Sequence, residues 1–224
     1  MKPRELLNSG DSNEGLELQL INHDGRIALE CEGRQLSATN LGMAASELGR
    51  MASSPFRPAK QPKILFLGIG LGHVLQAARD ALPQEKASFH VCLEAPALPE
   101  WIAQNMKSDP LDDERVVLCE GSPFDSIPQE NAPYQAILAD LDALEGLAPP
   151  KWLPNRVRWL RQLSDSVKAG GMLGFLRHRR DPDLEKNLRV VGCNPVYDYV
   201  GVSEKSKKNR IVYLARKGHY QRTH

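Results

Sequence analysis

The sequence contains no Cys-x-x-Cys pair and no long apolar run that is free of charged residues. Its four cysteines are isolated, and Cys92 and Cys119 lie within apolar segments, so we expect buried free thiols and a reducing compartment. The N-terminus lacks the apolar core of a secretion signal, and no segment is long enough to span a bilayer. We therefore expect a cytoplasmic protein that makes no contact with a membrane.

Metal-binding and repeat patterns are also missing. The six histidines are scattered without a recurring ligand spacing, so no metal site is expected. There is no internal repeat and no low-complexity segment. A chain of 224 residues can nevertheless bury a sizeable core, which favours one ordinary domain with a modest appendage.

The net charge of +1 hides two halves of opposite sign. Residues 1–150 hold 12 Lys and Arg against 22 Asp and Glu, whereas residues 151–224 hold 17 against 6. A solvated basic face is the favoured interpretation, and an anion-binding surface is the alternative. Nucleic acid would be such a partner, through Arg156, Arg158, Arg161, Arg177, Arg179 and Arg180. No RNA-binding module or aromatic platform accompanies these arginines, so nucleic acid is disfavoured.

The chain is organised around residues 63–78, where an apolar run leads into alternate glycines and then a helical pattern. Ile64 to Leu67 predict a buried parallel strand. Gly68, Gly70 and Gly72 predict a turn whose backbone a ligand can approach, followed by the positive end of a helix. A tight connection without a ligand is the alternative, but such a turn suits a nucleotide.

The next apolar run, residues 89–93, ends at Glu94, which lies 22 positions after Gly72. This is the distance at which a carboxylate meets ribose hydroxyls in nucleotide-binding folds. His73 stands in place of a further glycine, which makes NAD the less favoured ligand. The pattern resembles the folds of methyltransferases that bind S-adenosylmethionine.

The remaining segments alternate strand and helix patterns and end in two adjacent strands. We predict an α/β, Rossmann-like class I methyltransferase fold in residues 58–224, with a mostly parallel seven-stranded sheet and a C-terminal antiparallel hairpin. Gly170 and Gly171 are expected to end a helix over residues 155–168. Residues 1–57 should form a loose arm to residue 13, a small β-hairpin, a short third strand over residues 34–38 and a helix. The hairpin is a candidate contact for a homodimer.

Ligands of open parallel sheets lie beyond the carboxyl ends of the strands. The residues at these ends are therefore the candidate site. The glycines are assigned to the methionine part and the ribose, Glu94 to the ribose hydroxyls, and Glu120 with Gly121 to the adenine. Asp140, which ends the strand over residues 134–139, should face the sulfonium and act as the catalytic base. Simple solvation at a strand end is the alternative role for each acid.

Several of these segments together are similar to the spermidine synthase group of the class I methyltransferase-like fold. The matching segments, which span nearly the whole chain, are Glu32-Gly33-Arg34, Ile64 to Gly72, Glu94-Ala-Pro, Arg115-Val-Val with Glu120-Gly121, and Tyr134 to Asp140. The resemblance implies decarboxylated S-adenosylmethionine as the donor of an aminopropyl group to a diamine. It further implies that Asp140 takes the proton from the attacking amine.

The chain departs from this family at the residues that would bind the diamine. Leu71 replaces an acid of the glycine turn, residues 45–47 (Ala-Ser-Glu) replace Tyr-His-Glu, Leu36 replaces a glutamine that appears at Gln35, and Ala143 replaces a second aspartate, with Asp142 one position earlier. Few anchors for ammonium groups remain. We therefore favour intact S-adenosylmethionine and methyl transfer to an unidentified small molecule. Aminopropyl transfer, nucleotide binding without catalysis and methylation of nucleic acid are the alternatives.

Overall fold

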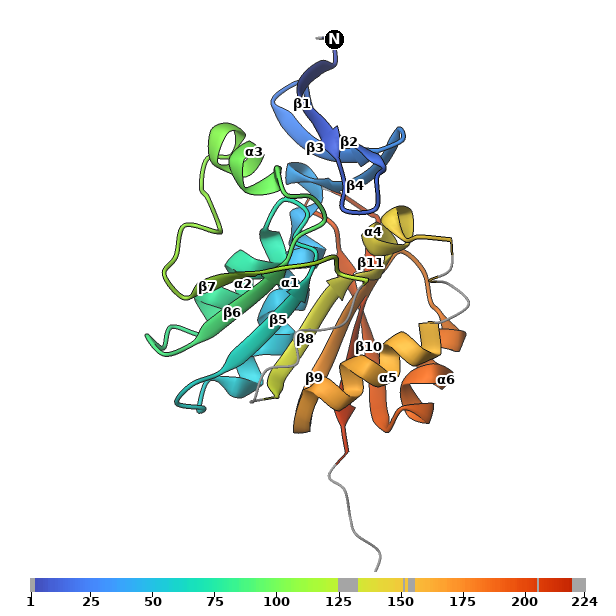
Figure 1. Ribbon diagram of the computed structural model, residues 1–224. Helices are drawn as coiled ribbons and strands as arrows, with labels where there is room; N and C mark the ends of the chain where they lie inside the picture. Colours follow the sequence, from blue (N-terminus) through green and yellow to red (C-terminus); the bar gives the residue numbers. More distant parts are fainter. Residues whose placement is uncertain (1–2, 125–132, 151, 153–155, 205, 219–224) are drawn as a thin grey trace, which may run out of the picture.

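The computed structural model describes residues 3–124, 133–150, 152, 156–204 and 206–218, which form two sheets (Figure 1). The N-terminal sheet is antiparallel and runs in the order β1-β2-β3-β4. The main sheet runs in the order β10-β11-β9-β8-β5-β6-β7. The strands are β1 (Glu5–Asp11), β2 (Glu17–His23), β3 (Arg26–Cys31), β4 (Arg34–Ala38), β5 (Lys63–Leu67), β6 (Ser88–Cys92), β7 (Val116–Cys119), β8 (Tyr134–Asp140), β9 (Val167–Arg177), β10 (Cys193–Gly201) and β11 (Asn209–Lys217).

The predicted sheet is confirmed in its parallel part and in its antiparallel end. Strands β9, β8, β5, β6 and β7 pair in parallel, while β11 pairs antiparallel with both β9 and β10. β11, the last of the described strands, therefore lies inside the sheet, between β9 and β10. Residues of β5 and β8 are buried on both faces, as expected for central strands that are covered by helices.

Helices cover both faces of the main sheet. α1 and α2 share a core with Ile64 and Phe66 of β5, and α5 and α6 share another core with Phe175 of β9. The sequence prediction places this helix in the N-terminal segment, residues 1–57, whereas α1 packs against the main sheet. The helices are α1 (Gly42–Ser53), α2 (His73–Ala81), α3 (Leu98–Asn105), α4 (Leu141–Leu147), α5 (Arg156–Ser166) and α6 (Pro182–Val190), with short 3-10 turns at Thr39–Leu41 and Ser54–Phe56.

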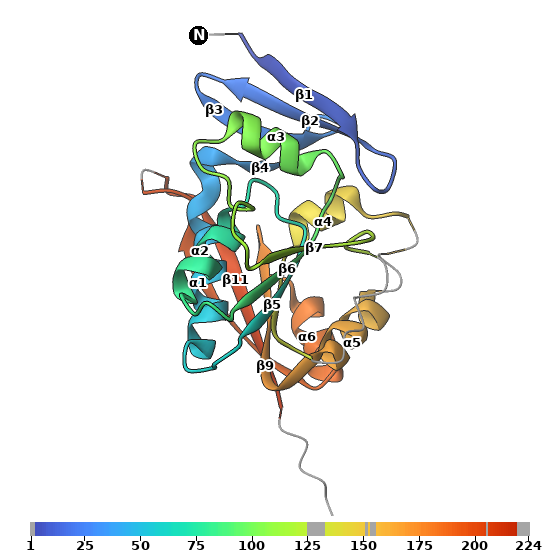
Figure 2. The same ribbon diagram turned by 60° about the vertical axis from the view of Figure 1, so that its left-hand side comes forward.

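The N-terminal sheet lies across the end of the main sheet where the parallel strands terminate (Figure 2). Leu18, Leu20 and Leu29 pack on Trp101 of α3 and Leu147 of α4 in a third core. The expected loose arm over residues 1–13 is wrong, because Glu5–Asp11 pairs with β2 along its length. The N-terminal sheet therefore covers the edge at which ligands of this architecture bind.

Helix α1 is held close to α2 at Gly49. A Cβ atom on Gly49 would lie 2.2 Å from the carbonyl oxygen of Val74, so the two helices meet backbone to backbone here. We expect Gly49→Ala to lower the free energy of unfolding by about 1–3 kcal/mol, the usual cost of overpacking, as measured by denaturation in urea. Helix propensity alone would favour alanine by about 1 kcal/mol, so a gain in stability would contradict this packing. Gly201→Ala is the control, since its Cβ would meet the flexible end of Met43 at 3.3 Å and would lie at an ordinary contact distance, 3.7 Å, from the carbonyl oxygen of Ser203.

No helix among the described residues combines the length and the apolar character that crossing a bilayer requires.

Candidate functional site

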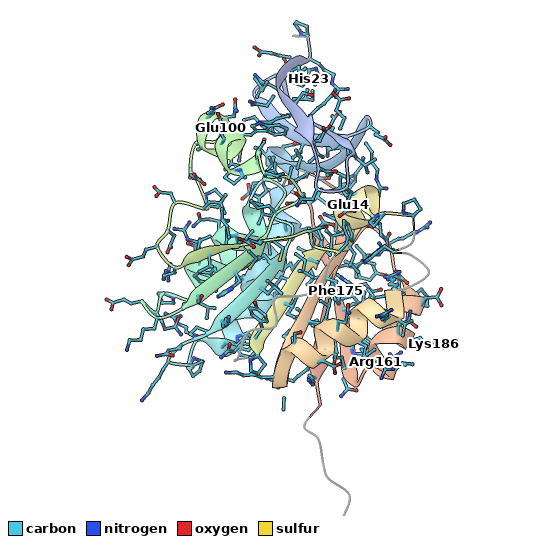
Figure 3. All side chains as sticks on the ribbon, viewed as in Figure 1. Glu14, His23, Glu100, Arg161, Phe175 and Lys186 are labelled. Atoms are coloured by element: carbon cyan, nitrogen blue, oxygen red, sulfur yellow. The ribbon has the colours of Figure 1, made fainter. Side chains whose placement is uncertain are left out.

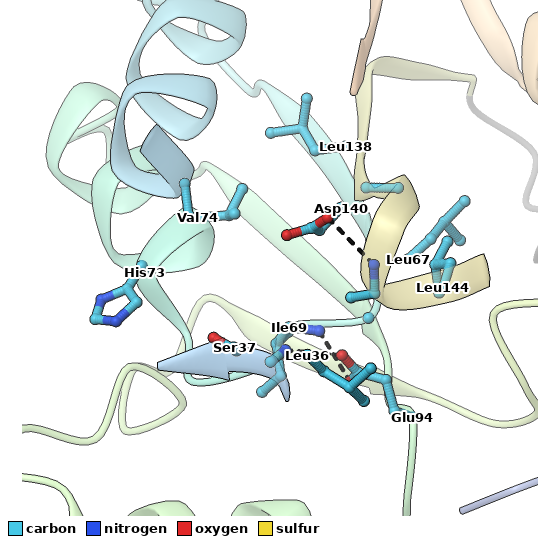
Figure 4. Close-up of a pocket in the computed structure, with 15 residues that line it drawn as sticks. Leu36, Ser37, Leu67, Ile69, His73, Val74, Glu94, Leu138, Asp140 and Leu144 are labelled. Atoms are coloured by element: carbon cyan, nitrogen blue, oxygen red, sulfur yellow. Dashed lines mark hydrogen bonds between the residues drawn. The ribbon is translucent and has the colours of Figure 1, made fainter. Parts of the chain in front are cut away.

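A small cavity lies at the carboxyl ends of β5, β6 and β8, against Leu36 and Ser37 of β4 (Figure 4). Its volume is about 30 Å³, and we call it the smaller cavity. Four of the predicted site residues line it together: Gly68, Gly70, Glu94 and Asp140. The structure thus brings the glycine turn and two strand-end acids to one place, which sequence spacing predicts for neighbouring parallel strands.

Glu94 is bound to the glycine turn. Its side chain is buried, and its two carboxylate oxygens accept hydrogen bonds from the amides of Ile69, at 2.9 Å, and Gly70, at 2.7 Å. Burial raises the pKa of Glu94, and the two amides oppose this shift. A carboxylate has about four acceptor sites, so Glu94 can still accept bonds from a hydroxyl ligand while it holds the turn.

The turn requires glycine at its alternate positions. Gly68, Gly70 and Gly72 have φ values of 78°, 54° and 84°, which belong to the left-handed region. A Cβ on Gly68 would lie 2.7 Å from Glu94, and one on Gly72 would lie 2.1 Å from Pro110. Gly72 is the N-cap of α2 and does not line the smaller cavity, unlike the other two.

Glu120 and Gly121 lie apart from this group. Both are exposed after the end of β7, and neither lines the smaller cavity. Their assignment to the adenine therefore stays a prediction. Part of the segment that follows, residues 125–132, lies outside the described residues.

Asp140 does not stand free in the cavity. Its two oxygens accept hydrogen bonds from the guanidinium of Arg210, both at 2.6 Å. It also caps α4, since Oδ1 accepts bonds from the amides of Asp142 and Ala143. These four hydrogen bonds hold the Asp140 carboxylate in place. The catalytic role assigned to Asp140 remains a prediction, and the observed contacts favour a positioning role instead.

Sequence reasoning missed Arg210. It is the second residue of β11, and it reaches from there to Asp140 and, at 2.9 Å, to Asp142. A signal was present: because β11 runs antiparallel to its neighbours, its beginning lies at the same edge as the carboxyl ends of the parallel strands. A charged residue at the start of such a strand is therefore a candidate site residue.

The pair of Arg210 and Asp140 belongs to a larger ionic network. Arg177 contacts Asp142 at 3.1 Å and Glu145 at 2.6 Å, and Asp181 binds both Arg156 and Arg177 at 2.9 Å. The side chains of Arg156 and Arg177 are only 14% and 10% exposed.

This network bears on the nucleic-acid alternative. Arg156 and Arg177 form ion pairs with carboxylates inside the protein, and Arg180 pairs with Glu185. Of the six arginines, Arg158, Arg161 and Arg179 are exposed and form no ion pair within the described part of the chain; Arg161 lies on α5 (Figure 3). The basic C-terminal part therefore offers fewer free arginines than its sequence indicates.

Asp181 gives the network a pH dependence. Burial would raise the pKa of Asp181, but the Leu184 amide and Arg156 outweigh it and leave the pKa below its ordinary value of 3.8. A lowered pKa stabilises the folded state above the ordinary value, and this contribution is lost as the pH falls through the folded-state pKa. We expect Asp181→Asn to be less stable than wild type at neutral pH, with the difference shrinking below pH 3.8. Urea denaturation from pH 7 to 3 measures this, and a difference that grows in acid would contradict the assignment.

The N-terminal sheet supplies further site residues that the sequence did not indicate. Ser37 of β4 accepts a hydrogen bond from the Leu71 amide, at 3.4 Å. The turn between β1 and β2 reaches the loop at Glu94, since Asn13 donates to the carbonyls of Leu93 and Glu94 at 2.7 and 2.9 Å. Glu14, on the side of this sheet that faces the main sheet (Figure 3), accepts a hydrogen bond from Ser122.

A second cavity of about 570 Å³ adjoins the first, and we call it the larger cavity. The two share Leu36, Ser37, Ala45, His73 and Asp140 in their walls. The larger cavity is completed by Gln35, Ala38, Leu41, Gly42, His178, Val202, Lys208, Asn209 and Arg210.

His73, at the start of α2, lines both cavities beside α1. Its ring packs on Gly42, where a Cβ would lie 2.6 Å from the ring, and its Nε2 has no hydrogen-bond partner within the described residues. Burial lowers the pKa of His73, which leaves the imidazole neutral at neutral pH.

Comparison with known structures fixes the fold. Two spermidine synthase structures each match 95% of this chain at 15% identity. The structure from Thermotoga maritima has a TM-score of 0.71, with 73% of its own chain covered. The structure in complex with the transition-state analogue AdoDATO has a TM-score of 0.70, with 72% of its own chain covered. The protein has a spermidine synthase-like fold. No family model matches the sequence, and neither does any curated protein.

Two methyltransferase structures also match this chain, over a smaller share of its length. The 1,6-didemethyltoxoflavin-N1-methyltransferase of Burkholderia thailandensis, with bound 1,6-didemethyltoxoflavin and S-adenosylhomocysteine, matches with a TM-score of 0.54 and 17% identity, over 79% of this chain and 80% of that one. The precorrin-6y C5,15-methyltransferase of Geobacter metallireducens matches with a TM-score of 0.53 and 14% identity, over 76% and 87%. At these identities the likeness establishes the fold, and the chemistry has to be argued from the site.

Proposed function

We propose that the protein binds S-adenosylmethionine at the smaller cavity and transfers its methyl group to a small molecule held in the larger cavity. The smaller cavity has the glycine turn and the buried carboxylate that a nucleoside needs, and related folds hold S-adenosylhomocysteine and AdoDATO. When bound, this cofactor supplies a methyl group on a sulfonium, an electrophile that a nearby lone pair can attack.

The described residues fit the cofactor by their chemistry. Glu94 retains acceptor sites for ribose hydroxyls beside the turn. The amides at the start of α2, in His73 and Val74, have no partner inside the helix and suit the carboxylate of intact S-adenosylmethionine. The smaller cavity alone is too small for a nucleoside, so the side chains of Leu36 and Ser37 in the shared wall must shift when the cofactor enters.

The contact between Arg210 and Asp140 is the observation that favours methyl transfer over aminopropyl transfer. A diamine acceptor needs carboxylates for its ammonium groups, and Asp140 is the one carboxylate among the described residues that line the larger cavity. Arg210 neutralises it with two hydrogen bonds of 2.6 Å. A cationic acceptor would therefore meet Arg210 and Lys208 without an unpaired acid to bind it.

Calorimetry with S-adenosylmethionine, its decarboxylated form and methylthioadenosine tests this proposal. We expect the intact cofactor to bind more tightly than the decarboxylated form by about fivefold, because the helix N-terminus favours an anion by about 1 kcal/mol. Tighter binding of the decarboxylated form would overturn methyl transfer in favour of aminopropyl transfer. If none of the three binds, the nucleotide site itself is refuted.

Nucleotide binding without catalysis is the second candidate. The observation that favours it is that both carboxylate oxygens of Asp140 already accept hydrogen bonds from Arg210. A protein of this kind would bind S-adenosylmethionine and leave every acceptor unmethylated. Release of S-adenosylhomocysteine in the presence of an acceptor would exclude it.

A further inference from the structure

Cations outnumber acids among the described residues that line the larger cavity. The cations are Lys208 and Arg210. Asp140 is the opposing acid, and it is already bound by Arg210 and by the amides at the start of α4. The other lining side chains are apolar or carry neutral polar groups. A ligand of this cavity finds free donors and no free carboxylate.

The donors in this wall are only partly used. Arg210 is 8% exposed, and its Nε is a buried donor without a partner in the described part of the chain. Its contacts to Asp140 and Asp142 use three of the five guanidinium hydrogens. Lys208 is exposed and forms no ion pair with the described residues. Because Nε is shielded, a ligand in the larger cavity can reach Arg210 only through the one hydrogen of its terminal nitrogens that no carboxylate uses.

The number of lining cations without a counterion indicates the charge of the anion. Arg210 is balanced by Asp140 and Asp142, so Lys208 is the one fully charged lining group left without a counterion in the described structure. One unpaired cation matches a single negative charge. The rest of the wall includes Leu36, Leu41 and Val202, which suit an apolar ligand body.

We propose that the acceptor is a small carboxylic acid, bound as its carboxylate by Lys208 and Arg210 with its apolar body against β4 and α1. This proposal rests on the proposed function, since it names the substrate class of the same site. It also accounts for the acids that are missing from the diamine-binding positions, because those acids would repel a carboxylate.

Competition between isosteric probes tests the charge of the acceptor. Benzoate, benzamide and benzylamine have similar size and differ in charge, and their binding to the full chain can be followed by ligand-observed NMR. We expect benzoate to bind about fivefold more tightly than benzamide, and benzylamine to bind most weakly, because a charge-assisted hydrogen bond is stronger than a neutral one. Equal binding of the three probes, or preference for benzylamine, would overturn the proposal.

Two neighbouring lysines provide a matched pair of variants. Lys208→Met should abolish the preference for benzoate over benzamide, and Lys207→Met, which removes an exposed lysine that does not line the cavity, should preserve it. The same loss in both variants would show that the effect is general surface charge, and the site would be rejected. Inorganic phosphate that displaces benzoate more strongly than acetate does would overturn the carboxylate in favour of a phosphate ester.

The probes separate this proposal from the one on which it rests. Calorimetry with S-adenosylhomocysteine reports the nucleotide site alone, whereas benzoate reports the larger cavity, which is open without the cofactor. Nucleotide binding without a benzoate preference would refute the carboxylate acceptor only. A benzoate preference without nucleotide binding would refute methyl transfer and retain the carboxylate site.

Discussion

Replacing Arg210 with methionine is expected to lower the free energy of unfolding by about 3–5 kcal/mol, because the variant leaves two partly buried carboxylates without their common cation. Asp140 and Asp142 are 21% and 14% exposed, and both bind this guanidinium. Denaturation in urea measures the loss.

Arg216→Met is the matched control for this result. Arg216 lies on the same strand but is exposed and forms no ion pair with the described residues, so its replacement should cost less than about 0.5 kcal/mol. Adding Asp140→Asn to Arg210→Met should recover part of the stability, because Asp140 forms no other ion pair in the described structure, whereas Asp142 keeps Arg177. If the two arginine variants are equally stable, the ionic network does not stabilise the fold, and the role assigned to Arg210 in it is wrong.

Glu94→Gln is expected to weaken the binding of S-adenosylmethionine by roughly 10- to 100-fold, which corresponds to about 1–3 kcal/mol. The glutamine side chain has one acceptor oxygen, so the amide of either Ile69 or Gly70 loses its partner and ribose hydroxyls meet a weaker acceptor. Calorimetry on the wild type and the variant gives the ratio of the affinities.

Glu120→Gln is the control for Glu94, and it also tests the adenine assignment. Glu120 is another strand-end acid, but it is exposed and lies outside both cavities. Its replacement should leave the affinity within about twofold if solvation is its whole role. A large loss at Glu120 would support the contact with adenine that the sequence suggests, and an unchanged affinity at Glu94 would remove the cofactor assignment.

The parts of the fold that the sequence predicts are those with local signals. The strand of residues 63–67, the glycine turn and Glu94 follow from an apolar run, backbone freedom and a fixed spacing along the chain. The parallel sheet follows from the alternation of strands and helices. These signals lie within a few tens of residues, and they place Gly68, Gly70 and Glu94 in one cavity.

The parts that the sequence does not predict depend on distant partners. β1 is a polar segment whose order comes from pairing with β2, and Asp140 meets Arg210 across 70 positions. The glycine pair at residues 170–171 was wrongly expected to end a helix, because it lies within β9. A Cβ on Gly171 would meet the carbonyl oxygen of Gln135 at 2.8 Å, so this glycine permits close strand pairing.

The position of β11 has a consequence for how the protein is made. Synthesis on the ribosome proceeds from the N-terminus, so β8, β9 and β10 emerge before the strand that joins β9 to β10. Until residue 210 leaves the exit tunnel, Asp140 and Asp142 have no arginine from β11, and β9 lacks its neighbour on that side. A nascent chain can therefore form the glycine turn early, but Arg210, which completes the wall of the larger cavity, arrives only after β8, β9 and β10 have been synthesised.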